Sequence, residues 1–148
     1  MSIQNILERQ KVDLITIRPE DTIETAAKIL TTHNIGAIPV RDSEAKMVGV
    51  LSERDLVRGF ATKGSSVMSL AVADLMTSKV TSCRSEDSVK DAMKKMSKLH
   101  IRHLPVIDDD GGVIGMISLR DVMELRLEQS EMEASELRAY AIASGGAL

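Results

Sequence analysis

Aromatic residues, cysteine and long apolar runs are all scarce in this sequence of 148 residues. It has one tyrosine, one phenylalanine and no tryptophan, and 19 Lys and Arg against 22 Asp and Glu give a net charge of −3. Nucleic-acid binding usually requires a basic face, and single-strand binding requires several stacking rings, so both are disfavoured. The single cysteine, Cys83, excludes an internal disulfide framework and favours a reducing compartment.

Membrane and secretion signals are missing as well. No apolar run approaches the roughly 18 residues of a membrane span, and the N-terminal stretch lacks the apolar core of a signal peptide. The remaining composition, 43% hydrophobic and 28% charged, is that of an ordinary globular protein. We therefore expect a soluble, cytoplasmic protein that needs neither a disulfide nor a metal to fold.

The sequence contains one unit twice. A shift of 66 positions aligns residues 20–56 with residues 86–122 without a gap, and 12 of the 37 pairs are identical. Average composition would give roughly two identities over this length. An internal repeat of this kind predicts two copies of one structural unit.

Each copy shows the same order of expected elements. Short apolar stretches at residues 14–17 and 80–81 predict a first strand. An i, i+3, i+4, i+7 apolar stripe then predicts a helix, with Asp21 and Glu24 in one copy and Ser88 and Asp91 in the other as capping pairs. Two strands joined by a polar turn and a second helix follow, with strands at residues 35–40, 47–51, 101–107 and 113–117 and helices that start at Ser52 and Ser118.

The expected fold class is therefore α+β, with two β-α-β-β-α units packed in pseudo-two-fold symmetry. Residues 59–69, rich in small side chains, form the expected linker, and residues 123–143 predict a helical tail that is solvated or packs on a partner. We expect three segments: the first repeat with an N-terminal lead-in, the second repeat, and the tail, at residues 1–66, 67–125 and 126–148.

A repeated heptapeptide, Gly-apolar-apolar-Ser-x-Arg-Asp, carries the chemistry, at residues 49–55 and 115–121. One interpretation is structural, because Ser-x-x-Asp ahead of a helix can form a capping box. The other is a nucleoside pocket. A carboxylate can accept hydrogen bonds from ribose hydroxyls, a serine hydroxyl and helix-start amides suit a phosphate, and a glycine lets the backbone approach a ligand closely.

These residues resemble the CBS domain family, named for cystathionine β-synthase. The resemblance covers residues 3–125 and rests on both heptapeptides, on Ile-Gly-Ala-Ile-Pro-Val and Ile-Arg-His-Leu-Pro-Val, and on Val-Ala-Asp-Leu-Met-Thr at residues 72–77. It implies a stand-alone Bateman module, in which two facing repeats bind adenosine-containing ligands in two clefts. AMP or ATP is the expected ligand, with ADP, NAD or S-adenosylmethionine as alternatives, and the resemblance implies a homodimer.

In the CBS family, each Ser-x-x-Asp stretch forms a strand-to-helix corner, and this corner faces strands of the other repeat. One cleft would contain Val50, Ser52, Arg54, Asp55, Thr81, Ile101, Arg102 and His103. The other would contain Met116, Ser118, Arg120, Asp121, Ile15, Ile35, Gly36 and Ala37. Arg102 and His103 replace Gly36 and Ala37 of the first copy, so the cleft of Asp55 is expected to prefer phosphorylated ligands. The alternative is that both are ordinary strand residues facing water or an acid.

Three functions remain open. The first is a regulatory module whose nucleotide shifts it between two arrangements read by an effector protein. The second is a dimerisation scaffold with vestigial pockets. The third is an enzyme, because IMP dehydrogenase carries a CBS pair, but a chain of this length lacks room for its catalytic barrel. We expect no catalytic residue and no metal, because Cys83, His33 and His100 have no ligand-like spacing.

Overall fold

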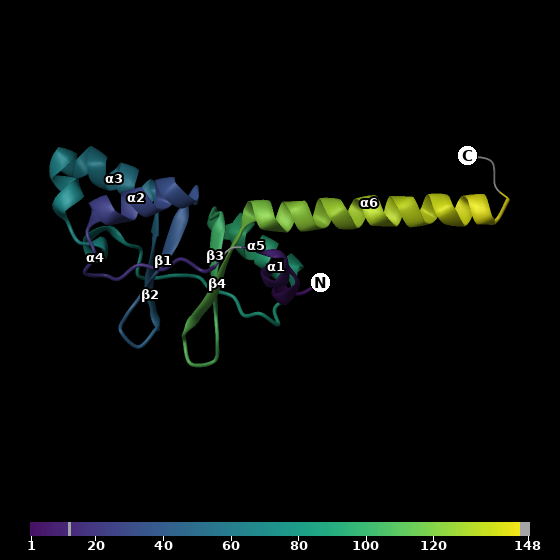
Figure 1. The fold of residues 1–148 in the computed structure, drawn as a ribbon, viewed down its shortest axis with the longest axis horizontal. Helices are drawn as coiled ribbons and strands as arrows, with labels where there is room; N and C mark the ends of the chain where they lie inside the picture. The colour runs from purple at the N-terminus through teal and green to yellow at the C-terminus, as the bar shows by residue number, and fades with distance from the viewer. Residues whose placement is uncertain (12, 146–148) are drawn as a thin grey trace.

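The structure, a computed structural model, describes residues 1–11 and 13–145 and has two similar halves (Figure 1). The first half contains α2 (Ile23–His33), β1 (Ala37–Arg41), β2 (Met47–Ser52) and α3 (Glu53–Lys63). The second contains α5 (Val89–Leu99), β3 (His103–Ile107), β4 (Val113–Ser118) and α6 (Leu119–Ala143). Outside this pattern lie α1 (Ile3–Arg9), the 3₁₀ helix η1 (Gly64–Ser69) and α4 (Val72–Leu75).

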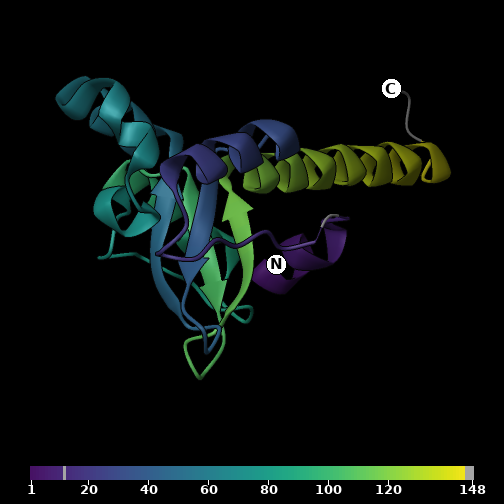
Figure 2. The same cartoon turned by 60° about the vertical axis from the view of Figure 1, so that its left-hand side comes forward.

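The two hairpins have the same register, as the repeat predicts. Pro39 pairs with Val50 in the β1–β2 hairpin, and Pro105 pairs with Met116 in β3–β4, with an irregularity one residue later in each. The hairpin tips meet through an antiparallel bridge between Lys46 and Gly112, and they overlap in the turned view (Figure 2). The two sheets therefore lie against each other, and the expected α+β fold of two paired repeats is confirmed.

The expected first strands are wrong, because each is a single parallel bridge. Ile17 pairs with Val40, and Cys83 pairs with Val106. Continuing the first ladder towards residue 15 would need a backbone N–H at Pro39, and the second would need one at Pro105. Proline has no N–H, so the pairing stops after one residue in both halves.

One capping expectation is also wrong, and the expected linker is more regular than its composition indicates. The N-cap of α2 is Thr22, whose hydroxyl accepts from the Thr25 amide at 3.2 Å, whereas Asp21 accepts from the Arg18 amide. The expected linker is mostly helical, since residues 59–63 continue α3 and residues 64–69 form η1. Val67 explains part of this, because its side chain is buried in the core of the first half.

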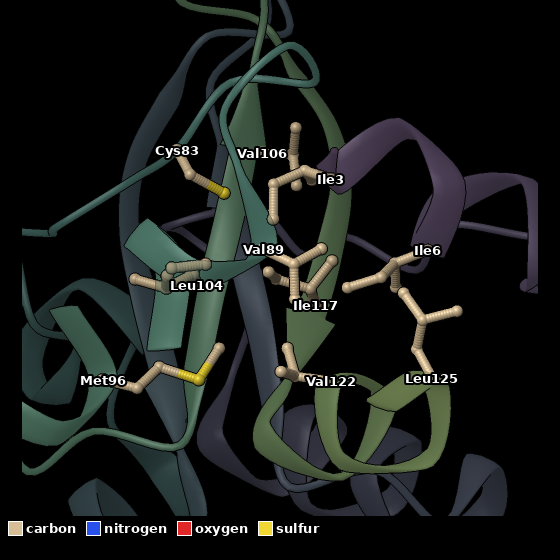
Figure 3. Packing of buried hydrophobic residues seen from close by; sticks show 11 residues of the cluster. Ile3, Ile6, Cys83, Val89, Met96, Leu104, Val106, Ile117, Val122 and Leu125 are labelled. Carbon is tan, nitrogen blue, oxygen red and sulfur yellow. The ribbon is translucent and has the colours of Figure 1, made fainter. Parts of the chain in front are cut away.

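The chain crosses over between the halves before each repeat begins. Ile3 and Ile6 of α1 are buried with Leu104, Ile117 and other residues of the second repeat (Figure 3). Val72 of α4, which precedes the second repeat, is buried in the core of the first. Each core thus depends on a helix that comes before the other repeat in the sequence.

Helix α6 is continuous from the second repeat into the expected tail. Val122 and Leu125 are buried, and the rest of the helix extends away from the body (Figure 1). The expected segment limit at residue 126 lies inside this helix, and residues 146–148 of the tail lie outside the described residues. Burial of Cys83 raises the pKa of its thiol to about 11, so this side chain has the character of a core residue.

Candidate functional site

Both Ser-x-x-Asp corners form capping boxes. Ser52 donates its amide and hydroxyl to Asp55 Oδ2 at 2.9 and 3.0 Å, and its hydroxyl accepts from the Asp55 amide at 3.2 Å. Ser118 and Asp121 repeat the exchange of amide bonds at 2.8 and 3.1 Å. The capping interpretation is therefore confirmed. The carboxylate groups of Asp55 and Asp121 lie at two strand-to-helix corners, and each corner borders a cavity.

The first cavity, of about 470 Å³, lies at the corner of Asp55. All eight residues predicted for this cleft line it: Val50, Ser52, Arg54, Asp55, Thr81, Ile101, Arg102 and His103. Residues of the first repeat form one side and residues of the second form the other, as the family geometry implies. Whether they bind a ligand remains a prediction.

The second cavity, of about 1160 Å³, lies at the corner of Asp121. The eight residues predicted for it also line it: Met116, Ser118, Arg120, Asp121, Ile15, Ile35, Gly36 and Ala37. One expectation is corrected, because the two cavities share a wall. Gly36, Ala37, Arg102 and His103 border both, so Arg102 and His103 do not belong to the cleft of Asp55 alone.

Asp55 is held more tightly than its counterpart. Its side chain is 6% exposed, and Thr77 donates a hydroxyl to Asp55 Oδ1 at 3.2 Å. The Arg58 guanidinium lies 3.6 Å from the same oxygen. Thr77 also exchanges two backbone hydrogen bonds with Val50, at 2.9 and 3.0 Å, so the segment before the second repeat closes this corner.

At the corner of Asp121 a side chain takes the place of that backbone segment. Gln10, the residue that ends α1, donates its amide to the Met116 carbonyl at 2.9 Å and to Asp121 Oδ2 at 3.2 Å. Asp121 is half-buried, and Oδ1 has no hydrogen-bond partner among the described residues. The two corners thus have the same sequence motif, but Thr77 covers the corner of Asp55 and Gln10 covers the corner of Asp121.

The glycine that precedes each corner has a different role from the one expected. A side chain at Gly49 would come within 2.8 Å of Met76 and 2.9 Å of the Thr77 carbonyl, and one at Gly115 would come within 2.6 Å of Leu7. The missing Cβ therefore lets the preceding segment of the chain pack on the corner, whereas we expected close approach of a ligand.

The residues at the clefts that the sequence analysis missed include Thr77, Lys79 and Gln10. Thr77 and Lys79 line the first cavity, and Gln10 lines the second. The sequence carried one signal, because Thr77 ends the family stretch at residues 72–77. At a shift of 66, however, Lys11 aligns with Thr77, so the repeat gave no match at this position.

Charge distinguishes the two clefts. Arg54, Lys79 and Arg102 line the first cavity with Glu53 and Asp55. The second has Arg102 and Arg120 with three acids, and Glu124 accepts a 3.0 Å bond from Arg120. The first cleft therefore has an excess of positive charge and the second an excess of negative charge, with histidines counted as neutral.

His103 lies in the wall between the clefts and packs on Gly36, where an added Cβ would be 3.1 Å from its Cε1 atom. Burial lowers the pKa of His103 below its ordinary value, and the neighbouring Arg102 lowers it further. Asp121 and Glu53 oppose this shift. The imidazole is therefore mostly neutral at pH 7.

This shift makes the contribution of His103 to stability depend on pH. In the window just below its unfolded pKa, near 6.5, the unfolded chain binds more protons at this site than the folded chain does. We expect the wild type to lose stability relative to His103→Gln as the pH falls from 7.5 to 5, measured by urea unfolding. His33→Gln, which changes an exposed histidine, is the control. A gain in the stability of the wild type relative to His103→Gln on acidification would contradict the assigned direction.

The described residues contain neither a candidate metal cluster nor a membrane-spanning helix. No group of three or more His, Cys, Asp or Glu side chains within 1–11 and 13–145 is arranged to hold a metal ion. In the same part of the chain, no helix combines the length and the apolar character needed to cross a membrane.

Two of the relatives that match most of this chain are an Arabidopsis protein and an archaeal enzyme. The CBS domain-containing protein CBSX3, mitochondrial, of Arabidopsis thaliana is 37% identical over 125 residues, which is 82% of this chain and 60% of that protein. The inosine-5′-monophosphate dehydrogenase of Methanocaldococcus jannaschii is 32% identical over 114 residues, which is 77% of this chain and 22% of the enzyme. This chain therefore spans about three fifths of the first protein and about a fifth of the second.

Solved structures show the same fold. A CBS-domain containing protein from Agrobacterium tumefaciens has a TM-score of 0.79 and 33% identity, over 84% of this chain and 92% of that one. The CBS domain pair of protein MJ0100, solved with 5′-methylthioadenosine and S-adenosyl-L-methionine, has a TM-score of 0.78 and 28% identity, over 87% and 98%. CBSX2 in complex with AMP has a TM-score of 0.75 and 25% identity, over 87% and 98%.

The family model of the CBS domain matches residues 6–62 and 72–128, which is more than half of the sequence. These two matches contain the two repeated corners and the strands and helices that position them. The chain therefore belongs to the CBS domain family.

Proposed function

We propose that this chain is a regulatory module that binds an adenosine-containing nucleotide between its repeats. The observation that carries the proposal is the cleft of Asp55, where a carboxylate faces a cavity that also contains Arg54, Lys79 and Arg102. Similar CBS pairs were solved with AMP and with S-adenosyl-L-methionine, which supports an adenosine ligand. We infer AMP or ATP for this cleft, with NAD and S-adenosylmethionine as alternatives.

The roles of the residues follow from their hydrogen-bonding capacity. Asp55 Oδ2 is used by Ser52, whereas Oδ1 accepts from Thr77 and keeps a second lone pair for a ribose hydroxyl. The guanidinium groups of Arg54 and Arg102 and the ammonium group of Lys79 are suited to phosphate oxygens. In the other cleft Asp121 and Ser118 would hold the ribose, with fewer cations available for a phosphate.

The output of the module is a change in its arrangement. A ligand that contacts both repeats favours the arrangement in which both walls can reach it, and it shifts the population by its difference in affinity. The CBS family model matches both repeats, which supports a regulatory role. We further infer a cytoplasmic homodimer that acts on an effector protein.

A thermal-shift series with the phosphate varied tests the proposal. We expect AMP and ATP at millimolar concentration to raise the melting temperature, and adenosine to raise it less, because a ligand at 100 times its Kd stabilises the fold by about 2.7 kcal/mol. Arg102→Ala should remove most of the difference between AMP and adenosine. Arg138→Ala, on the far part of α6, should leave that difference unchanged. No shift with any of these compounds or with NAD or S-adenosylmethionine would contradict the proposal.

A scaffold with vestigial pockets is the second candidate. It is favoured by one observation, that both corner carboxylates are already bonded within the chain. Under this function a partner protein would bind equally well with and without nucleotide, and Asp55→Asn would not change that binding. A pull-down from the source cell with and without AMP distinguishes the two candidates.

A further inference from the structure

The distal part of α6 extends away from the body (Figure 1), although it carries many apolar side chains. Beyond the buried Leu125 the helix continues for 18 residues, which is roughly 27 Å of helix. Five large apolar side chains on it are 58–74% exposed: Leu127, Met132, Leu137, Tyr140 and Ile142. A single helix of this length is marginal in water without tertiary packing. A second surface that covers these side chains would stabilise the segment.

One face of this segment has the spacing of a coiled-coil seam. Leu127, Ser130, Ala134, Leu137 and Ala141 follow one another at intervals of 3, 4, 3 and 4 residues. At 100° per residue, the centre of this stripe lies about 130° around the helix from the centre of Val122 and Leu125, which pack on the body. The two leucines are 62% and 69% exposed, and the small residues between them would let a second helix approach closely. We refer to these five residues as the α6 seam.

The charges beside the α6 seam favour a second copy of the same helix as the partner, and they favour parallel pairing. Arg126 and Glu133 precede the two positions occupied by Leu127 and Ala134, and Glu131 and Arg138 follow Ser130 and Leu137. In a parallel pair, Arg126 would face Glu131 of the partner subunit, and Glu133 would face Arg138 of the partner subunit. Two-fold symmetry makes four attractive contacts. Antiparallel pairing with Leu127 opposite the partner's Leu137 would instead place Glu131 against the partner's Glu131, and likewise Glu133 against the partner's Glu133.

These side chains are available for such contacts. Within the described part of the chain, no ion pair involves Glu131, Glu133 or Arg138. Arg126 Nη1 lies 3.5 Å from the Met93 sulfur, a weak acceptor that leaves the other guanidinium donors free. Glu128, which pairs with Arg9 of α1 at 2.6 Å, lies outside the seam and would keep its partner.

We propose that residues 127–141 of α6 form a parallel two-stranded coiled coil with the same helix of a second copy of this chain. Leu127 also lines the cleft of Asp121, so the partner helix would border the mouth of that cleft. The inference names the surface and direction of a dimer, and it does not depend on nucleotide binding.

Disulfide cross-linking of the full chain tests the direction. Ala134→Cys and Ser130→Cys place a thiol in the α6 seam, and each should cross-link to its own copy almost completely under mild oxidation in a parallel pair. Met132→Cys, on the opposite face of the helix, is the matched control and should give at least about tenfold less dimer. The native Cys83 is buried with a raised pKa, so it contributes little to the reaction.

Two further measurements decide the remaining outcomes. Mixing Ser130→Cys with Ala134→Cys should give no more cross-link than either variant alone, because antiparallel helices are the ones that bring residue 130 to residue 134. Adding Leu137→Glu to Ala134→Cys should reduce the cross-link at least about tenfold, with the melting temperature of the body as the check on folding. The proposal is overturned if the mixed pair dominates, if Met132→Cys reacts as well as Ala134→Cys, or if Leu137→Glu changes nothing.

Discussion

Ile3→Ala is expected to lower the free energy of unfolding by about 2–5 kcal/mol, the range for removing a large aliphatic side chain from a packed core. Ile3 is fully buried, and it packs with residues of the second repeat although it precedes the first (Figure 3). Its amide also donates to the Asp87 carbonyl at 2.8 Å, which fixes α1 at the start of α5. The cavity left by the substitution would lie in the centre of the second core. Urea unfolding followed by circular dichroism measures the change.

Ile142→Ala is the matched control for this substitution. Ile142 lies near the end of α6 and is 66% exposed, so the same change of side chain should alter the free energy of unfolding by less than about 0.5 kcal/mol. Equal effects of the two substitutions would mean that α1 does not belong to the second core.

Periodic apolar residues predicted most of the regular elements. The stripe from Ile23 predicted α2, and the stripe from Val89 predicted α5, because a helix that covers a sheet must repeat its apolar residues with the helical period. Hairpin lengths and polar turns predicted all four strands to within about two residues. These features depend on neighbours in the sequence, so one sequence suffices to find them.

The errors in the fold come from contacts between distant segments. Each expected first strand is a single bridge because extending its ladder would need an N–H from a proline more than 20 residues away. The helical turn at residues 64–69 places Val67 in the first core. The placement of α1 on the second repeat follows from tertiary packing, since its own pattern of Ile3 and Ile6 would fit either core. Local periodicity carries no information on which core a short helix will join.

The residues of the clefts also fall into a part that the sequence predicts and a part that depends on distant segments. The Ser-x-x-Asp corners could be predicted because the same residues occur twice at one spacing. The resemblance to the CBS family then predicted which strands face them. Thr77, Lys79 and Gln10 come from the segments that cross between the halves, where the two copies differ in sequence. The repeat therefore predicts what the clefts have in common, and the crossing segments provide what distinguishes them.

Asp55→Ala is expected to cost more stability than Asp121→Ala, about 2–3 kcal/mol against about 1 kcal/mol. Both substitutions remove a capping box. Asp55 is itself 6% exposed and also accepts the Thr77 hydroxyl, so its loss removes one more hydrogen bond to a charged group and leaves a void at this corner. Asp121 is half-buried, and the Gln10 amide that it releases keeps its bond to the Met116 carbonyl at 2.9 Å.

The same pair of variants separates the two clefts in binding. Asp55→Ala should weaken AMP binding by about 10–100-fold, the cost of losing a hydrogen bond to a charged group, because its cleft holds the excess of cations. Asp121→Ala should leave AMP binding to the cleft of Asp55 within about twofold of the wild type. Calorimetry measures both affinities, and Asp110→Ala in the exposed β3–β4 turn controls for the change of net charge. If Asp121→Ala weakened AMP binding as much as Asp55→Ala, the phosphate preference would belong to the shared wall of Arg102 and His103, and the two corners would act as one site.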